Sequence, residues 1–288
     1  RVRNAAGLTL NGGTVRFAHT AGAASYSETL GAVALNAGAN VIVASRAAVG
    51  QTSALTIASL SRSAGSIDFA GTGLGVDDRN RIFITGQADG LIGPWATVNG
   101  AALAAYSGTL GVYAATGTAY TDIAARGPST TIPDIGSAGA VRINSDGVSG
   151  PIALAADTTT IGSVLQNTGT EATIDTAAKT LRATGVYVPA GKAGVTVGAA
   201  AGDGALTAAT SGGGLTLVND GATPLTINAS IADNGSASGL AKSGAGTVTL
   251  ASANTFSGAT VLSGGPLVLA DSDALRNSTV TPNAASPV

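Results

Sequence analysis

The sequence predicts an all-β protein whose short strands stack as a β-solenoid, in the form of a right-handed parallel β-helix. Three observations favour this fold class. Large apolar residues recur in pairs separated by one residue, and these pairs return at intervals of ~19 to ~27 residues, which suits one coil of a solenoid. Glycine supplies 42 of 288 residues. Charged residues make up only 10% of the chain, against roughly 25% in a typical soluble domain, so good helix formers such as Lys and Glu are scarce.

The apolar pairs mark the expected strands along the chain. Each pair usually encloses a small or polar residue, which is the period-two pattern of a strand with one buried face. Glycine- and asparagine-rich turns separate the strands, as at Asn11-Gly12-Gly13 and Asn219-Asp220-Gly221. In chain order the pairs are Leu8 and Leu10, Val33 and Leu35, Leu55 and Ile57, Ile82 and Ile84, Leu215 and Leu217, Leu225 and Ile227, Val248 and Leu250, and Leu267 and Leu269.

The spacing between pairs favours a solenoid, because one coil contains two or three short strands joined by turns. A β-sandwich or jelly roll is the alternative, since it also shows many short strands. Its core usually carries more aromatic residues than the four Phe and one Trp of this chain. The intervals that suggest single coils run from Leu10 to Leu35, from Leu35 to Ile57, from Ile57 to Ile84, from Ile227 to Leu250 and from Leu250 to Leu269.

A stretch from Gly239 to Val280 carries a more specific pattern, and it resembles the autotransporter-associated β-strand repeat of large secreted bacterial proteins. Val248 replaces the usual Leu, and Pro266 stands where Thr is common. The resemblance implies a β-solenoid fold and an extracellular or bacterial cell-surface location, and it does not specify an activity. The matching residues are Lys242, Gly244, Gly246, Thr247, Leu250, Asn254, Thr255, Phe256, Gly258, Thr260, Gly264, Gly265 and Leu267.

Each position of this repeat has a physical interpretation. Val248 and Leu250 should point inward while the threonines beside them point outward, where β-branched side chains suit an exposed strand face. Gly244 should permit a tight corner. Asn254 should bind backbone groups at a turn and, if repeated in neighbouring coils, form an inward ladder. Phe256 should cap or fill a coil.

We expect residues 1–238 to form degenerate solenoid coils, 239–280 to continue the same solenoid, and 281–288 to be an uncharged tail. The chain has no Met, so Arg1 is not a translation start and we expect a piece of a longer product. Neither end offers a charged cap of the kind that closes natural solenoids. The sequence therefore predicts that at least one end is covered by the next repeat or by another copy, with end-to-end self-association as the result.

No catalytic, cofactor-binding or metal-binding set can be assembled from the sequence. The chain has no Cys and a single histidine, His19, which we interpret as a surface or turn residue. The net charge is −2 without a basic patch, so nucleic acid is not an expected partner. The uncharged run of residues 91–121 contains Pro94 and Asn99, so we do not expect this segment to span a membrane as a helix.

Two places are weak candidates for ligand contact. The first is the charged turn of Asp77, Asp78, Arg79 and Arg81, with Asp68 nearby in sequence, where acids and arginines together are typical of polysaccharide-degrading β-helix enzymes. Its alternative interpretation is a solvated loop whose charges neutralise one another. The second place is aromatic: Trp95 or Tyr106 could stack on a sugar, although a single Trp is more often a structural anchor.

Other polar motifs have simpler interpretations. Asp271 and Asp273 form a polar turn after the last apolar pair. Oxygen ligands of the kind that calcium prefers occur there and at the charged turn, but neither shows an EF-hand pattern. Three tripeptides match the N-glycosylation sequon and are interpreted as chance matches in a Ser- and Thr-rich chain; they begin at Asn228, Asn234 and Asn277.

The main hypothesis is a non-enzymatic extracellular scaffold, stalk or adhesin segment built from solenoid repeats. The alternatives are a polysaccharide-degrading enzyme that uses the Asp77–Arg81 loop and a glycan-binding module. The partners to test are a surface glycan and a second copy of the chain.

Overall fold

The computed structural model describes residues 6–18, 25–46, 48, 50–127 and 129–282. The chain divides into two compact units, Arg1–Thr116 and Gly117–Val288. The boundary falls inside the range 1–238, which the sequence predicts to be one run of coils. Apart from the 3-10 turn η1 (Gly117–Ala119), every regular element in the described ranges is a β-strand. The predicted all-β class and the parallel solenoid stack are confirmed, while the hand of the coil stays a prediction.

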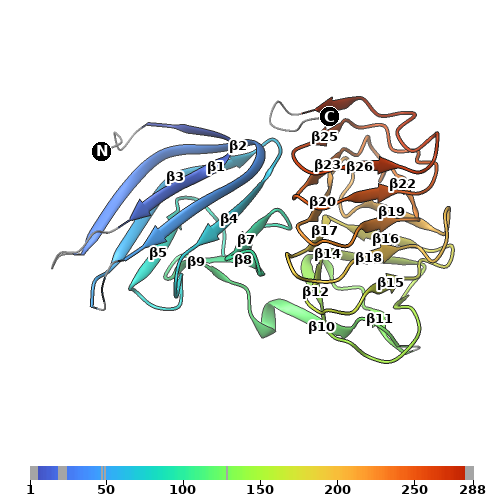
Figure 1. The fold of residues 1–288 in the computed structure, drawn as a ribbon, viewed down its shortest axis with the longest axis horizontal. Coiled ribbons are helices and arrows are strands. Elements are labelled where there is room, and N and C mark those ends of the chain that lie inside the picture. The colour runs from blue at the N-terminus through green and yellow to red at the C-terminus, as the bar shows by residue number, and fades with distance from the viewer. Residues whose placement is uncertain (1–5, 19–24, 47, 49, 128, 283–288) are drawn as a thin grey trace. The chain divides into compact units, whose positions relative to one another are not determined.

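The first unit is one continuous sheet whose strands change direction along the chain (Figure 1). Strands β1 to β5 and β7 pair in parallel, whereas β8 pairs antiparallel with β6, β7 and β9. The strands are β1 (Leu8–Ala18), β2 (Tyr26–Ser45), β3 (Ser53–Arg62), β4 (Ser66–Ala70), β5 (Asn80–Ile84), β6 (Gly90–Leu91), β7 (Ala96–Val98), β8 (Ala102–Ser107) and β9 (Gly111–Ala114).

The register of the first unit confirms two predicted intervals and corrects a third. Leu10 pairs with Leu35, and Ile57 pairs with Ile84, as the spacing of their apolar pairs predicts. The predicted pairing of Leu35 with Ile57 is wrong, because Leu35 pairs with Arg62 and Ile57 with Leu30. The reason is the length of β2, which is a single strand of 20 residues. It pairs with β3 along its first half and with β4 along its second half. Two apolar pairs can therefore lie on neighbouring strands without being paired with each other.

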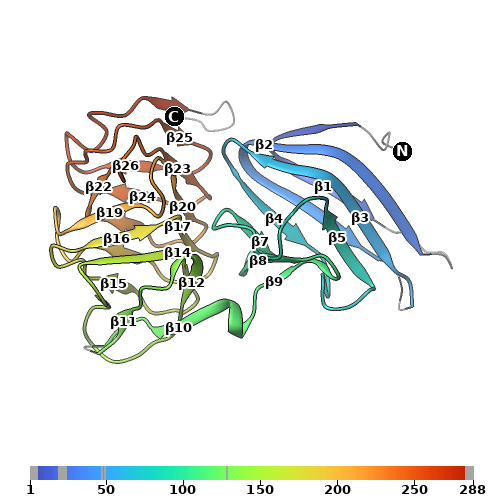
Figure 2. The same ribbon diagram turned by 180° about the vertical axis from the view of Figure 1, so that it is seen from behind.

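The second unit is a stack of coils whose strands follow one another in chain order (Figures 1 and 2). All of its strand pairs are parallel. Its strands are β10 (Tyr120–Ala124), β11 (Thr131–Ile132), β12 (Gly136–Ser145), β13 (Ala153–Leu154), β14 (Thr158–Gln166), β15 (Ala172–Ile174), β16 (Thr180–Ala183), β17 (Gly185–Val188), β18 (Val195–Val197), β19 (Ala205–Ala208), β20 (Leu215–Asn219), β21 (Leu225–Ile227), β22 (Ser230–Ala232), β23 (Leu240–Ser243), β24 (Val248–Leu250), β25 (Thr260–Leu262), β26 (Leu267–Leu269) and β27 (Val280–Pro282).

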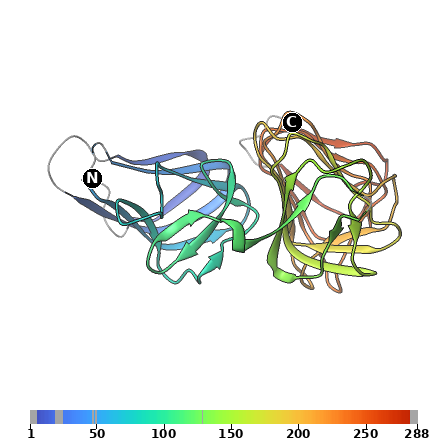
Figure 3. The ribbon, with the colours of Figure 1, turned by 90° about the horizontal axis from the view of Figure 1, so that it is seen from below.

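Three ladders form the walls of this stack, seen end-on in Figure 3. Ladder one contains β10, β12, β14, β17, β20, β23, β25 and β27, ladder two contains β14, β16, β19 and β22, and ladder three contains β15, β18, β21, β24 and β26. Each coil contributes one rung to a ladder, so equivalent residues of successive coils lie one strand spacing apart.

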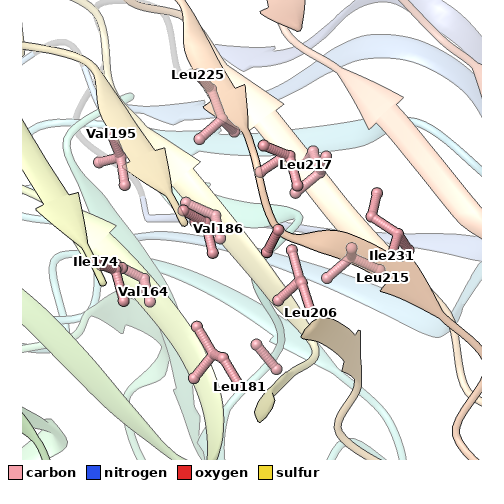
Figure 4. Close-up of a cluster of buried hydrophobic side chains, with 14 of the residues drawn as sticks. Val164, Ile174, Leu181, Val186, Val195, Leu206, Leu215, Leu217, Leu225 and Ile231 are labelled. Carbon is pink, nitrogen blue, oxygen red and sulfur yellow. The ribbon is translucent and has the colours of Figure 1, made fainter. Parts of the chain in front are cut away.

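The inward faces of the three ladders enclose a core that is mostly aliphatic. Val164, Val186 and Leu217 follow one another on ladder one and are fully buried. Figure 4 shows how they converge with residues of the other two ladders, such as Leu206 and Val195. Because medium-sized branched side chains repeat at every rung, each coil covers the core of its neighbour, which is the nearest-neighbour stabilisation expected of a solenoid.

Coil length in the second unit varies more than the sequence predicts. The shortest interval between paired residues separates Leu250 from Leu269, and the predicted pairing of Ile227 with Leu250 is confirmed. The longest interval between paired residues separates Val186 from Leu217. This interval is longer than the ~27 residues that the sequence predicts as the maximum coil length. The extra length lies in the loops between β18 and β19 and between β19 and β20, outside the ladders, where added residues do not disturb the register.

Candidate functional site

The charged turn of the first unit holds its charges in a local pair. Asp77 forms an ion pair with the guanidinium of Arg79 and also accepts a hydrogen bond from the Arg79 backbone N–H at 2.9 Å. Asp78 is exposed. This turn lies between the buried Leu74 and strand β5, so the sequence places a solvated connection between two elements of the sheet.

The remaining candidates around this turn are engaged elsewhere. Arg81 lies on β5 with its guanidinium carbon 5.2 Å from the ring centre of Phe83. Asp68 accepts hydrogen bonds from the hydroxyl of Thr97 at 2.8 Å and the backbone N–H of Gly100 at 2.7 Å. Asp68 therefore fixes the turn after β7, while Asp77 fixes the turn before β5, and the two acids serve separate turns.

The aromatic candidates lie differently from each other. Trp95 is half-buried against the core of the first unit, and the guanidinium of Arg62 stacks 5.4 Å from its ring centre. Burial lowers the pKa of this arginine to about 10. The prediction that Tyr106 is an exposed aromatic residue that stacks on a sugar is wrong. Only 6% of Tyr106 is accessible, and its hydroxyl accepts a hydrogen bond from the Ile84 N–H at 3.4 Å.

A surface groove that the sequence does not predict lies in the second unit. Its volume is about 450 Å³, which falls within the range of small-molecule sites. Arg126 and Glu171 bring opposite charges to it, and the Arg126 guanidinium donates to the backbone carbonyl of Glu171 at 3.2 Å. The lining residues are Arg126, Ser149, Gly150, Pro151, Glu171, Thr173 and Ala199.

A column of threonines begins in this groove and continues along ladder three. Thr173 pairs with Thr196, Thr196 with Thr226, and Thr226 with Thr249. All four side chains are half-buried on the outward face, at the spacing of adjacent strands, about 4.8 Å. A groove with one cation, one anion and aligned hydroxyls suits a polyhydroxylated ligand. The local signal for the column is the repeated triplet of an outward Thr between two inward apolar residues.

No group of three or more His, Cys, Asp or Glu side chains that could hold a metal ion occurs among the residues the structure describes. His19 lies outside the described residues. At the second acidic turn, Asp271 accepts from the Asp273 N–H at 2.7 Å, and Asp273 pairs with Arg276 at 3.4 Å. No helix in the described ranges is long and apolar enough to cross a membrane.

Three inward side chains fasten corners of ladder one, and the sequence does not predict two of them. Gln166, Asn219 and Lys242 are fully buried near the ends of β14, β20 and β23. Each donates to one carbonyl four residues later in its own coil and to a second carbonyl in the next coil, so it ties two turns together. The acceptors are Thr170 and Gly194 for Gln166, Thr223 and Thr247 for Asn219, and Gly246 and Gly264 for Lys242.

Lys242 is the charged member of this set. It also donates to the Gly244 carbonyl at 2.9 Å. Desolvation lowers the pKa of its ammonium group to about 8, and the negative charge of Asp220 acts in the opposite direction. Gly244 itself has φ +83°, and a Cβ there would clash with the Asn219 carbonyl oxygen, so this corner requires glycine as predicted.

The inward apolar pair, the buried Phe256 and the backbone contacts of Asn254 are also confirmed, whereas a ladder of stacked asparagines stays a prediction. Val248 and Leu250 are fully buried, and Phe256 fills the core at 2% exposure. Asn254 accepts from the Ile231 N–H at 2.7 Å and donates to the Ala274 carbonyl at 2.8 Å. Its amide therefore links three coils through the backbone.

These features agree with the comparisons with known proteins. Residues 240–269 match the family model of the passenger-associated-transport-repeat. The chain is an autotransporter-passenger-like repeat protein. It is 34% identical over 269 residues to the adhesin BmaC autotransporter of Brucella suis biovar 1 (strain 1330). That alignment covers 91% of the passenger-like chain and 7% of the relative's length. No solved structure matches it.

Proposed function

We propose that this passenger-like chain is a non-enzymatic segment of a secreted or surface-exposed bacterial protein, acting as a rigid scaffold that carries an adhesive surface. The observation that supports this role is the continuity of the ladders. Strands β23 to β26, which hold the matched repeat, pair in register with β20 and β21 and share one core with them. Such a stack builds length without needing a catalytic centre.

The adhesive part of the proposal rests on the relative and on the groove. The relative is named an adhesin, and the passenger-like chain corresponds to only a small share of it. The groove around Arg126 and Glu171, extended by the threonine column, is the surface where we place contact with a glycan. The charged groups would orient the sugar, and the threonine hydroxyls would bind successive hydroxyl groups along the coil stack.

Binding of the chain to an array of neutral and acidic glycans tests this proposal. Replacing Arg126 and Glu171 together by Ala removes two charge-assisted contacts and should weaken binding by about 10-fold or more. The matched control replaces Asp78 and Arg79 by Ala, which removes one anion and one cation from the first unit and should leave binding unchanged. Binding that is lost only in the control variant would move the site to the charged turn.

The enzymatic alternative has its own readout. Incubation with acidic and neutral polysaccharides should yield no new reducing ends and no unsaturated products. Turnover by the chain that disappears in Asp77→Ala or Asp78→Ala would overturn the non-enzymatic role.

A further inference from the structure

The three sequons of the chain differ in whether their asparagine is available for modification. Transfer of a sugar to asparagine requires a free side-chain amide on an accessible surface segment, with a hydroxyl residue two positions later. The side-chain nitrogen of Asn228 instead donates to the Gly198 carbonyl at 3.1 Å, and that of Asn234 donates to the Ala208 carbonyl at 2.9 Å. Both asparagines are half-buried.

The serine of the first sequon is engaged as well. Ser230 pairs with Ala205 on ladder two, and its hydroxyl donates to the Ala253 carbonyl at 2.9 Å. Modification at Asn228 would therefore require two contacts that join neighbouring coils to open, one of the amide and one of the serine hydroxyl. At Asn234 it would break the contact across one coil boundary that the amide makes with Ala208.

The third sequon is free at both of its reacting positions. Asn277 and Thr279 are exposed, and their side chains make no hydrogen bond within the described part of the chain. Between them, Ser278 points inward: its hydroxyl donates to the Gly258 carbonyl at 2.7 Å and lies 2.8 Å from the hydroxyl of Thr260. The middle residue thus anchors the segment while the asparagine and threonine face solvent on either side of it.

We propose that the folded chain presents one acceptor site for N-linked sugar, Asn277, and that the folded coils block Asn228 and Asn234. The sugar is supplied by a phosphate-activated donor. Its C1–O bond to phosphate breaks as a bond forms between C1 and Nδ2 of Asn277. The phosphate-bearing group leaves with the bonding electrons, and one amide proton passes to a base of the transferase.

The test exposes the folded chain to two transferases that differ in their donor. One arm uses UDP-glucose with a soluble asparagine glucosyltransferase, and the other uses a lipid-diphosphate-linked oligosaccharide with a membrane oligosaccharyltransferase. Peptide mass spectrometry should find the sugar on Asn277 in at least one arm, and that arm identifies the source of the donor. Asn228 and Asn234 should remain unmodified in the folded chain.

Short peptides and point variants provide the controls. Peptides containing each sequon should all be modified in the productive arm, because they lack the hydrogen bonds of the coils. Asn277→Gln and Thr279→Ala should lose the modification, whereas Thr279→Ser should retain it. The proposal is overturned if Asn277 stays unmodified in both arms, or if the folded chain is modified at Asn228 or Asn234 as readily as at Asn277.

Discussion

The two units both stack parallel strands over an apolar core, but their last strands differ. In the first unit the parallel strands are followed by antiparallel β8 and β9, and β9 lies against β5 so closely that a Cβ on Gly111 would clash with the Ile82 carbonyl oxygen. In the second unit the last described strands of ladders one and three remain exposed. Val268, Leu269 and Val280 are 43%, 50% and 42% accessible.

This difference shows how an antiparallel hairpin changes the edge of a parallel stack. A further parallel coil always creates a new free edge, whereas an antiparallel hairpin folds back and covers the previous edge with its own backbone. In the second unit, a buried amide or ammonium group at each of three corners of ladder one ties two coils together instead. We therefore expect the first unit to depend on its hairpin and the second on its corner residues.

The largest effect is expected from Gly111→Ala, which should separate the hairpin from β5. The residue has φ +76° and no room for a Cβ, so strain and overpacking together should destabilise the first unit by about 4 kcal/mol. Urea unfolding followed by fluorescence of Trp95, the only Trp of the chain, reports on this unit. Gly108→Ala is the matched control in the same hairpin, because the nearest atom to its Cβ would be 3.9 Å away. Equal midpoints for both variants would contradict the role of the hairpin.

A slightly smaller effect is expected in the second unit from Lys242→Met. The substitution keeps an unbranched side chain that is one heavy atom shorter but leaves buried carbonyls without a donor, which should cost about 3 kcal/mol. Hydrogen exchange of the amides in β23 to β26 measures the change locally. Lys192→Met is the control, because Lys192 is half-buried and donates to one carbonyl, that of Asn167 at 2.9 Å. Equal loss of protection in both variants would contradict a larger stabilising role for the Lys242 corner than for an ordinary lysine contact.

The pH dependence of stability provides a second test of the buried Lys242 contact. The pKa of Lys242 is about 8 in the folded chain, against an ordinary value of 10.5. Between these values the unfolded chain binds a proton that the folded chain has released, so the stability contributed by this group rises as pH increases from about 8 to 10.5. Denaturation midpoints of the second unit should follow this rise in the wild type. A rise of the same size in Lys242→Met would show that another group causes it.

The smallest effect on stability is expected from Leu269→Lys, within about 0.5 kcal/mol because half of the side chain is exposed. Its effect on association should be larger. Light scattering should show concentration-dependent growth for the wild-type chain and a reduced growth for this variant, since a charge on β26 opposes the stacking of another coil. Val76→Lys, at a residue 72% exposed in the first unit, should leave association unchanged. A wild-type chain that stays monomeric at all concentrations would contradict the predicted end-to-end association with a second copy.

The sequence by itself determined the strands marked by its apolar pairs, several of their rungs and the Gly244 corner of the matched repeat. Alternation places Val248 and Leu250 inward whatever surrounds them, because side chains on a strand switch faces at every residue. Regular spacing then predicts partners such as Leu10 with Leu35 and Leu250 with Leu269. Glycine at position 244 follows from the tight corner that the repeat needs.

Only the tertiary structure decided the division into two units, the reversal at β8 and the groove. Period-two alternation is the same in a parallel and an antiparallel strand, so nothing in the residues of β8 specifies its direction. Likewise, the unusual length of β2 is set by its pairing with two consecutive strands. Arg126 and Glu171 are 45 residues apart in the chain. They meet because the intervening coils stack beneath them, which is a consequence of coil length and register rather than of any local motif.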